Sequence, residues 1–342
     1  MSGILGFDVG LGKTFTSLAT IQHVQSIGVK KKTIFAVPNA VLTNWRKEAI
    51  ACYKSTDDCL FVGLDVDANG VGTLNSSNYA RDLNTILENK HRKIFVTYEA
   101  LGMIPMREGT IEEYERHLSL VDQSYNSSDT KSKSASIIKE GKLKGVTDAG
   151  AKGSAAVPFF EDMGIDSIVV DEGHSFKNSK ETVEFKAAKF LSDPATSNRG
   201  LDMQMKTWYI RGKSKLNDGA LILTATPITN SPLEIYSMLT LAIGEDEVNR
   251  RMGGVRGSDA FMQTFCSIGE EEVVSLAGVE RLQRVFTGLQ NTNLLRSMLN
   301  QVANIKSARQ VDLKIPDAEE VSTTVELPAS DVKELQRMQA NL

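Results

Sequence analysis

Short apolar runs rich in strand-forming residues recur along the chain and alternate with segments in which apolar residues recur at helical spacing. The most regular of these segments is 16–27, where Leu18, Ile21, Val24 and Ile27 fall on one helical face. Alternating strands and helices predict an α/β fold with a central, mostly parallel sheet flanked by helices. The predicted strands are 4–5, 33–37, 59–63, 93–97, 167–170, 220–224 and 321–327. The predicted helices are 16–27, 41–53, 76–89, 112–121, 181–191, 201–209, 232–241, 259–265, 279–302 and 328–339.

The pattern fails in the middle of the chain. Residues 124–136 are polar and poor in apolar side chains, and residues 141–156 are rich in Gly, Lys and Ala. We therefore interpret residues 107–156 as an insertion. Two interpretations of it stay open: a solvated loop, or an element that contacts DNA or a partner protein.

The sequence GFDVGLGKT, residues 6–14, lies between the first apolar run and the first predicted helix. Strand, Gly-rich loop, Lys-Thr and helix is the layout of a phosphate-binding loop, in which backbone N–H groups surround anionic oxygens. Lys13 would add positive charge, and Thr14 would bind Mg²⁺. The residues assigned to the phosphates are Gly10, Leu11, Gly12, Lys13 and Thr14. The strict pattern has Gly at position 7, where this chain has Phe7, so a simple Gly-rich turn before a helix stays open.

Two further strand ends carry polar side chains. Asp171 and Glu172 follow the apolar strand 167–170, and Thr224 ends the strand 220–224. Because ligands bind beyond the carboxyl ends of strands in open parallel sheets, these side chains are expected near the Gly-rich loop. We assign Asp171 to Mg²⁺ and Glu172 to the attacking water of a nucleoside triphosphatase. Catalysis would then depend on Lys13, Asp171 and Glu172, with His174 as a candidate coupling residue. The alternative for the Asp-Glu pair is a solvated strand end.

Composition narrows the picture further. The 342 residues are 41% hydrophobic and 24% charged, which predicts a packed globular chain of one large or two ordinary domains. A formal net charge of -4 means that any DNA site must be a local patch, since the chain has no overall basic field. The three cysteines lack metal-binding spacing and fit a reducing compartment. No apolar run is long enough to span a bilayer, and no signal peptide is visible, so we expect no membrane partner.

Five segments in order complete the pattern: GFDVGLGKT, VPNAVLTNW, IFVTYEAL, VVDEGHSFKN and LILTATPITNSPLEIYSML. They resemble the motifs of superfamily 2 DNA motors, and most closely the Swi/Snf-type remodelling ATPases with a DEAH-like box. Phe7 is compatible with that family, which often lacks the first Walker glycine. The segment SNRGLDMQMKTWYIR also resembles phage and mobile-element antirestriction or methylase–helicase proteins. The resemblance covers residues 4–342 apart from the insertion.

The resemblance implies a RecA-like lobe that hydrolyses ATP with Mg²⁺ and acts on double-stranded DNA through its backbone, with little sequence specificity. It implies coupling roles for His174, Thr224 and Thr226. It also implies that six residues in or near these segments face DNA: Pro38, Asn39, Thr97, Tyr98, Lys177 and Asn178.

The chain also departs from that family. Motors of this type bind ATP between two RecA-like lobes, and the second lobe supplies arginine fingers. No such motif follows residue 242, and the upstream Gln motif for adenine is missing. We therefore predict a first ATP-binding lobe over 1–242, a helical extension over 243–320, and a hinge into a second lobe over 321–342, with that lobe in the same or another chain.

Three functions stay open: a DNA translocase lobe, a strand-separating helicase, and a nucleotide-dependent interaction module without catalysis. The expected location is the cytoplasm of a bacterial or phage-infected cell, or the nucleus of a eukaryote.

Overall fold

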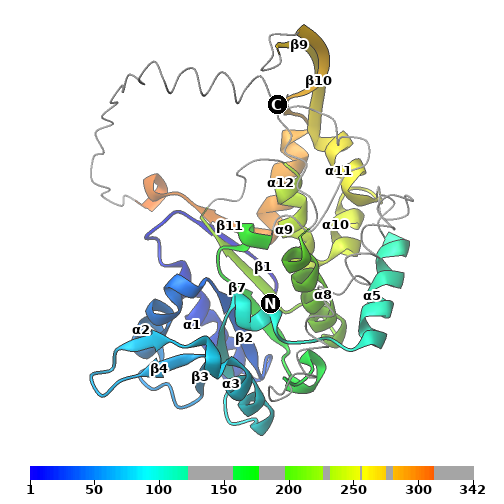
Figure 1. The fold of residues 1–342 in the computed structure, drawn as a ribbon. Helices are drawn as coiled ribbons and strands as arrows, with labels where there is room; N and C mark the ends of the chain where they lie inside the picture. The colour runs from blue at the N-terminus through cyan, green and yellow to red at the C-terminus, as the bar shows by residue number, and fades with distance from the viewer. Residues whose placement is uncertain (122–156, 177–196, 226–231, 255, 275–279, 312–342) are drawn as a thin grey trace, which may run out of the picture.

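A seven-stranded, all-parallel β-sheet forms the centre of the computed structural model (Figure 1). The structure describes residues 1–121, 157–176, 197–225, 232–254, 256–274 and 280–311. In spatial order, the strands are β11 (Ala303–Lys306), β1 (Gly3–Phe7), β8 (Ala220–Thr224), β7 (Ser167–Val170), β2 (Thr33–Val37), β6 (Lys93–Thr97) and β3 (Cys59–Phe61). With its phosphate-loop candidate directly after β1, this is the RecA-like α/β architecture that the sequence predicts.

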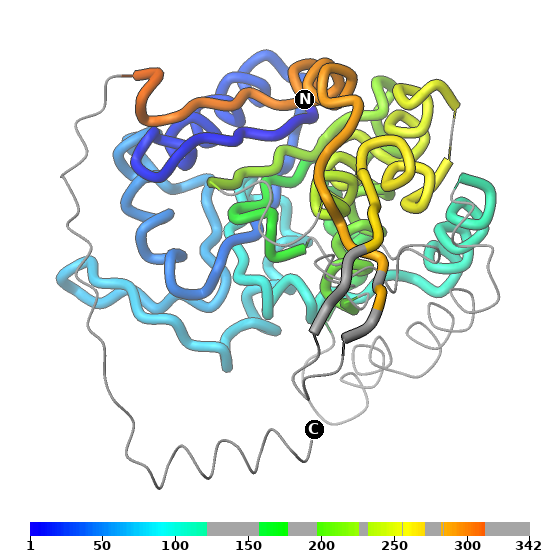
Figure 2. The backbone as a smooth tube through the Cα atoms, turned by 90° about the horizontal axis from the view of Figure 1, so that it is seen from above, coloured from blue at the N-terminus to red at the C-terminus, as the bar shows by residue number. Residues whose placement is uncertain are grey.

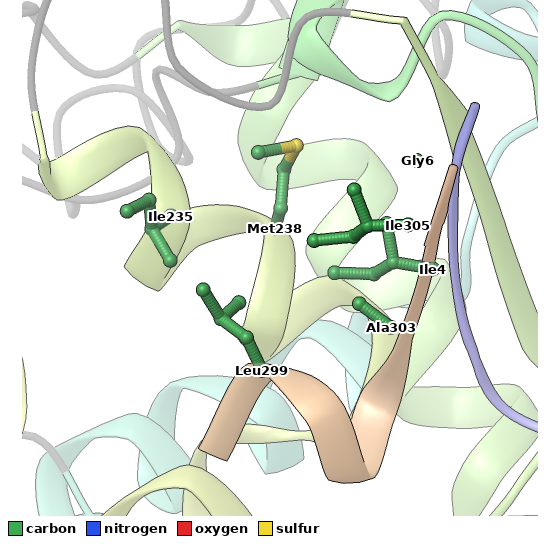
Figure 3. Close-up of a pocket in the computed structure, with 7 residues that line it drawn as sticks. All are labelled: Ile4, Gly6, Ile235, Met238, Leu299, Ala303 and Ile305. Carbon is green, nitrogen blue, oxygen red and sulfur yellow. The ribbon is translucent and has the colours of Figure 1, made fainter. Parts of the chain in front are cut away.

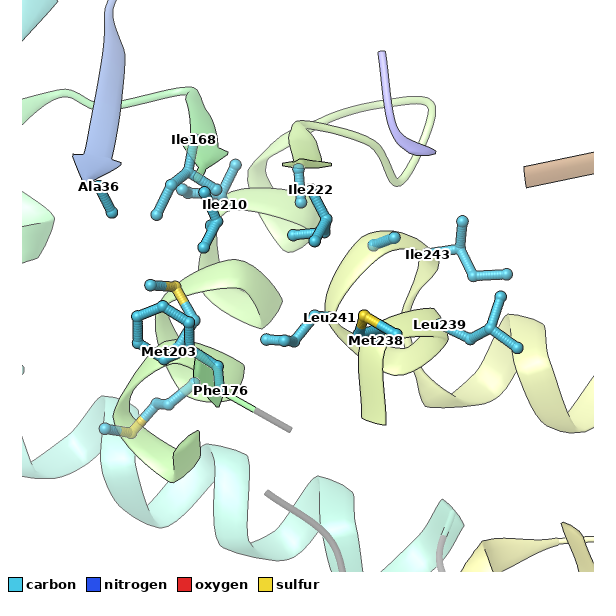
Figure 4. Close-up of a cluster of buried hydrophobic side chains, with 14 of the residues drawn as sticks. Ala36, Ile168, Phe176, Met203, Ile210, Ile222, Met238, Leu239, Leu241 and Ile243 are labelled. Carbon is cyan, nitrogen blue, oxygen red and sulfur yellow. The ribbon is translucent and has the colours of Figure 1, made fainter. Parts of the chain in front are cut away.

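Helices cover both faces of the sheet. Side chains along β2 alternate between the faces, as strand geometry requires: Phe35 and Val37 pack with α1 (Lys13–Ser26) and α2 (Leu42–Tyr53). Ile34 and Ala36 point to the opposite face, toward α8 (Asn198–Lys213) and α9 (Leu233–Ile243). Figure 4 shows this second cluster, where Ala36, Ile168 and Ile222 of the sheet face side chains of α8 and α9. The alternation explains why strands buried on both faces form continuous apolar runs.

The remaining elements connect or extend this core. Between β2 and β7 they are η1 (Asn39–Val41), β4 (Leu64–Val66), β5 (Gly72–Leu74), η2 (Ser76–Asn78), α3 (Tyr79–Thr85), η3 (Ile86–Glu88), α4 (Tyr98–Gly102), α5 (Glu108–Val121) and η6 (Phe160–Met163). After β7 they are η7 (Gly173–Phe176), α10 (Glu245–Arg251), α11 (Gly257–Phe265), β9 (Cys266–Val274), β10 (Glu280–Leu289), α12 (Thr292–Val302) and η8 (Ala308–Val311).

The C-terminal extension differs from the sequence prediction. Residues 279–302 were expected to form one helix, but their first half is β10, which pairs with β9 in an antiparallel hairpin, and only α12 is helical. The prediction is wrong for the first half because Val285, Phe286 and Thr287 are β-branched or aromatic and favour a strand, and Gly288 disfavours a helix. The extension therefore combines helices with a hairpin.

Strand β11 is a second element that the sequence did not indicate. It pairs in parallel with β1, so that Ile4 lies opposite Ala303 and Phe7 lies opposite Lys306. Figure 2 shows this late segment running beside the first strand of the chain. The extension thus returns to the central sheet and covers the outer edge of β1.

The beginning of the proposed insertion belongs to the lobe. Helix α5 buries Tyr114 and Leu118, and the Tyr114 ring lies 5.4 Å from the ring of Trp208 on α8. Residues 122–156 lie outside the described residues, as do the predicted helix 181–191, the strand 321–327 and the helix 328–339. Within the ranges that the structure describes, no helix is long and apolar enough to cross a membrane.

An aromatic stack between the sheet and α2 predicts the effect of one core substitution. Phe95 of β6 is fully buried, and its ring centroid lies 4.4 Å from that of Phe35 and 4.5 Å from that of Phe61. Phe95→Ala should lower the free energy of unfolding by about 3–5 kcal/mol, because it removes a buried ring and leaves a cavity. Urea denaturation measures this loss. Leu120→Ala, at a side chain that is 71% exposed, is the control and should change stability by less than about 0.5 kcal/mol.

Candidate nucleotide-binding site

The Gly-rich loop connects β1 to α1 at the carboxyl edge of the sheet. Gly10 and Gly12 adopt φ values of 85° and 76°, in the left-handed region that glycine occupies at little cost. Gly12 immediately precedes α1, so the free N–H groups of the first helical turn begin where the loop ends. Leu11 and Thr14 are half-buried beside it. This loop has the backbone that an anion site at a helix N-terminus requires.

Lys13 is the first residue of α1, and its side chain folds back over the loop. Its Nζ donates to the carbonyl of Phe7 at 2.8 Å. The ammonium group therefore lies at the end of β1. An anion held by the loop would compete with this carbonyl for the lysine.

Asp8 fixes the other side of the loop to the end of the described chain. Its N–H donates to the carbonyl of Lys306 at 3.0 Å, and its Oδ2 accepts from the N–H of Ala308 at 2.8 Å. The loop is thus bonded to the segment that joins β11 to η8. The sequence pattern carries no signal for this contact, because it spans 300 residues.

Asp171 ends β7 with a buried carboxylate. Its Oδ2 accepts from Nε1 of Trp45 at 2.8 Å, and its Oδ1 accepts from the N–H of Glu172 at 3.0 Å. Burial raises the pKa of Asp171, and the charge of Glu172 acts in the same direction. The bond from Trp45 and the positive charge of Lys13 act in the opposite direction and lower that pKa. The DEGH segment therefore lies within electrostatic range of Lys13 on the loop.

Glu172 has a strained backbone. Its φ of 45° lies in the left-handed region, where a side chain costs roughly 1–2 kcal/mol. Such strain persists only where surrounding contacts impose it, and it concentrates at functional sites. Next to it, Gly173 leaves no room for a side chain, since an added Cβ would lie 2.2 Å from Cγ2 of Ile222.

His174 connects the DEGH segment to the neighbouring strand. Its Nδ1 lies 3.2 Å from Oε2 of Glu172 and 3.4 Å from Oγ1 of Thr224, which is fully buried at the end of β8. A single imidazole nitrogen therefore faces both a carboxylate and the hydroxyl of the next strand. This arrangement can relay a change at one strand end to the other.

The strand order explains why these residues meet. Strand β8 lies between β1 and β7, and all three run in the same direction. Their carboxyl ends bring Lys13, Asp171, Glu172, His174 and Thr224 to one edge of the sheet. Thr226 lies outside the described residues.

The donor set fits Mg²⁺ bound together with phosphates. No group of three or more His, Cys, Asp or Glu side chains that could hold a metal occurs among the described residues. Asp171 and Thr14 are oxygen donors, and Mg²⁺ is commonly held by one or two carboxylates plus substrate phosphates. The protein would thus supply part of the coordination and a nucleotide the rest.

The residues that the resemblance assigns to DNA contact differ in their exposure to solvent. Pro38 and Asn39 are partly exposed after β2. Thr97 is fully buried, and its hydroxyl caps α4 by accepting from the N–H of Ala100 at 3.1 Å, so its side chain cannot contact DNA. Tyr98 is partly exposed, but its hydroxyl donates to the carbonyl of Asp171. Lys177 and Asn178 lie outside the described residues.

A small cavity lies behind β1, away from the loop. Figure 3 shows it between β1 and β11 on one side and α9 and α12 on the other. Its volume is about 50 Å³. Its lining is apolar: Ile4, Gly6, Ile235, Met238, Leu299, Ala303 and Ile305. A ligand pocket is usually about 300–1,000 Å³ with a few convergent polar groups, so this cavity is a packing defect rather than a nucleotide site.

Comparison with known proteins agrees with this geometry. A family described as a probable helicase domain matches residues 1–307. The chain belongs to this helicase domain family. The match includes the Gly-rich loop, the DEGH segment and β11. This assignment makes the chain a helicase- or translocase-type domain.

The chain is also similar to two curated proteins and to one solved structure. It is 30% identical over 367 aligned positions to "Defense against restriction protein B" of Escherichia phage P1, covering 96% of this chain but only 16% of that protein. It is 31% identical over 75 positions to a SWI/SNF-related chromatin regulator of Danio rerio, covering 19% of this chain and 8% of that protein. A Sulfolobus solfataricus SWI2/SNF2 ATPase core in complex with dsDNA superposes with a TM-score of 0.42 at 14% identity, over 90% of this chain and 40% of that chain.

The short distance between Gly173 and Ile222 predicts that a side chain at position 173 destabilises the fold. Gly173→Ala should lower the free energy of unfolding by about 1–3 kcal/mol, because the new methyl group forces Ile222 or the backbone of the DEGH segment to move. Thermal or urea unfolding measures it. Gly212→Ala is the matched control within α8, where an added Cβ meets nothing within 4 Å, and it should be neutral or stabilising by up to about 1 kcal/mol. Equal effects of the two substitutions would contradict the packing argument.

Proposed function

We propose that this helicase domain is the ATP-binding and ATP-hydrolysing first lobe of a Swi/Snf-like double-stranded DNA translocase, completed by a second RecA-like lobe. The single observation that carries the proposal is the convergence of the Lys13 loop, the Asp171–Glu172 pair and the His174–Thr224 contact at adjacent strand ends. These are the parts that phosphoryl transfer needs: a phosphate cradle, a metal ligand and a group that orients water.

Each side chain has a distinct role in this proposal. The loop N–H groups and Lys13 bind the phosphates, and Thr14 and Asp171 hold Mg²⁺. The metal ion neutralises charge that develops on the transferred phosphoryl group. Glu172 orients the attacking water, and its carboxylate is held beside His174, whose Nδ1 lies 3.2 Å from Oε2. His174 and Thr224 relay the state of the site to β8 and the segment that follows it.

We also propose double-stranded DNA as the binding partner of this lobe. The chain spans 16% of the phage relative, so the substrates and partners of a longer protein are part of the proposal. Pro38 and Asn39 directly follow β2 and are partly exposed, and we assign them to contact with the DNA backbone. The name of the phage relative favours a role connected with defence against restriction, and the solved SWI2/SNF2 core carries dsDNA.

Nucleotide binding tests the phosphate-loop assignment directly. Lys13→Ala should weaken Mg²⁺–ATP binding about 10- to 100-fold, because it removes a charge-assisted contact to the phosphates. Calorimetry or a fluorescent ATP analogue measures the affinity. Lys215→Ala, an exposed lysine in the turn before β8, is the control and should bind like the wild type. Unchanged binding by the Lys13 variant would refute the assignment.

The rate of ATP hydrolysis distinguishes a catalytic domain from a nucleotide-dependent module without catalysis. In the assembly that contains the second lobe, Glu172→Gln should bind Mg²⁺–ATP normally but lower DNA-stimulated hydrolysis about 10²- to 10⁴-fold, the range of general acid–base contributions. A phosphate-release assay measures the rate. If hydrolysis is unaffected, the non-catalytic module becomes the better interpretation. A strand-displacement assay on the same assembly then distinguishes unwinding from translocation.

A further inference from the structure

Asp171 is held from outside its own strand by two side chains. Nε1 of Trp45 donates to its carboxylate oxygen Oδ2 at 2.8 Å, and the hydroxyl of Tyr98 donates to its main-chain carbonyl. Trp45 belongs to α2, which follows β2, and Tyr98 begins α4, which follows β6. The side chain and the main chain of Asp171 are thus fixed by different elements.

Trp45 cannot easily move away from this contact. Its side chain is 1% exposed, and its ring lies 5.6 Å from Phe35 and 6.0 Å from Phe95. Rotating the indole would therefore disturb the core between α2 and the sheet. A buried indole N–H also needs an acceptor, and the carboxylate of Asp171 is that acceptor.

The hydrogen bond from Trp45 to Asp171 matters for metal binding because Asp171 is one of only two protein ligands that we assign to Mg²⁺. Among the described residues, no group of three or more His, Cys, Asp or Glu side chains could hold a metal, so the proposed site has only Asp171 and Thr14 assigned as protein ligands. Its Oδ1 already accepts from the N–H of Glu172, and its Oδ2 accepts from Trp45. Both oxygens therefore keep a fixed orientation and retain lone pairs for a cation.

We propose that Trp45 is a positioning residue that orients the Asp171 carboxylate for Mg²⁺. The proposal rests on the proposed nucleotide-binding function and adds a residue to it. A hydrogen-bonded partner that fixes a metal ligand typically contributes 10- to 100-fold in metal affinity. Asp171 binds Mg²⁺ with its full affinity only while the indole holds it.

The first experiment removes the N–H group and keeps an aromatic ring. Trp45→Phe should raise the Mg²⁺ concentration needed for tight binding of a fluorescent ATP analogue about tenfold, while affinity without Mg²⁺ stays within about twofold. Trp208→Phe is the matched control, because it removes the chain's other tryptophan, which packs on Tyr114 of α5. It should leave both affinities unchanged. An unchanged Mg²⁺ requirement in a folded Trp45→Phe protein overturns the proposal.

The second experiment keeps Trp45 in place and remains informative if Trp45→Phe fails to fold. The chain has two tryptophans, so Trp208→Phe leaves Trp45 as its sole indole. Adding Mg²⁺ with ADP should change the emission of Trp45, and Trp208→Phe/Asp171→Asn should lose that change. A nucleotide that binds with Mg²⁺ while the emission stays constant contradicts the proposal. A wild-type protein that binds no nucleotide at all contradicts the proposed function instead.

Discussion

Parallel pairing of β1 with β8 is the constraint on which the site depends. The pairing sets the end of β1, and therefore the Gly-rich loop, one strand away from the end of β7. Since all strands of the sheet run the same way, their carboxyl ends present Lys13, Asp171 and Thr224 at one edge. A one-residue slip of β1 would turn its side chains to the opposite face and shift the loop along the sheet.

Two residues at this edge, Asp171 and Glu172, adopt arrangements that lower the stability of the fold. Asp171 is an almost fully buried carboxylate whose pKa is raised by desolvation, and Glu172 takes a backbone conformation that favours glycine. Neither feature stabilises the fold by itself. A bound cation would offset the burial of the carboxylate, because it supplies the opposite charge that the described side chains provide only in part. These features fit the proposed binding of Mg²⁺ and nucleotide at this edge.

The sequence indicates most of the sheet because the strands 33–37, 93–97, 167–170 and 220–224 are buried on both faces and stand out as apolar runs. It also indicates the Gly-rich loop and the DEGH segment, whose residue types are set by local backbone and chemistry. It misses β11, since a strand of four residues, one half-buried and three exposed, carries little pattern. It misses the contacts of Trp45 and Asp8 because both depend on tertiary pairing between distant segments. Thr97 illustrates the opposite error: a resemblance suggests a surface role, but the side chain is buried and its hydroxyl caps α4.

The position of β1 in the sheet has a consequence for synthesis of the chain. This strand is synthesised well before its neighbours β8 and β11, which begin only at Ala220 and Ala303. Until β8 has emerged, both edges of β1 are unpaired, and until β11 has emerged, one edge stays unpaired. Pairing over such separations is slow and exposes apolar strands to misassociation. The pairing of β1 within the sheet is thus complete only after residue 306 has been added.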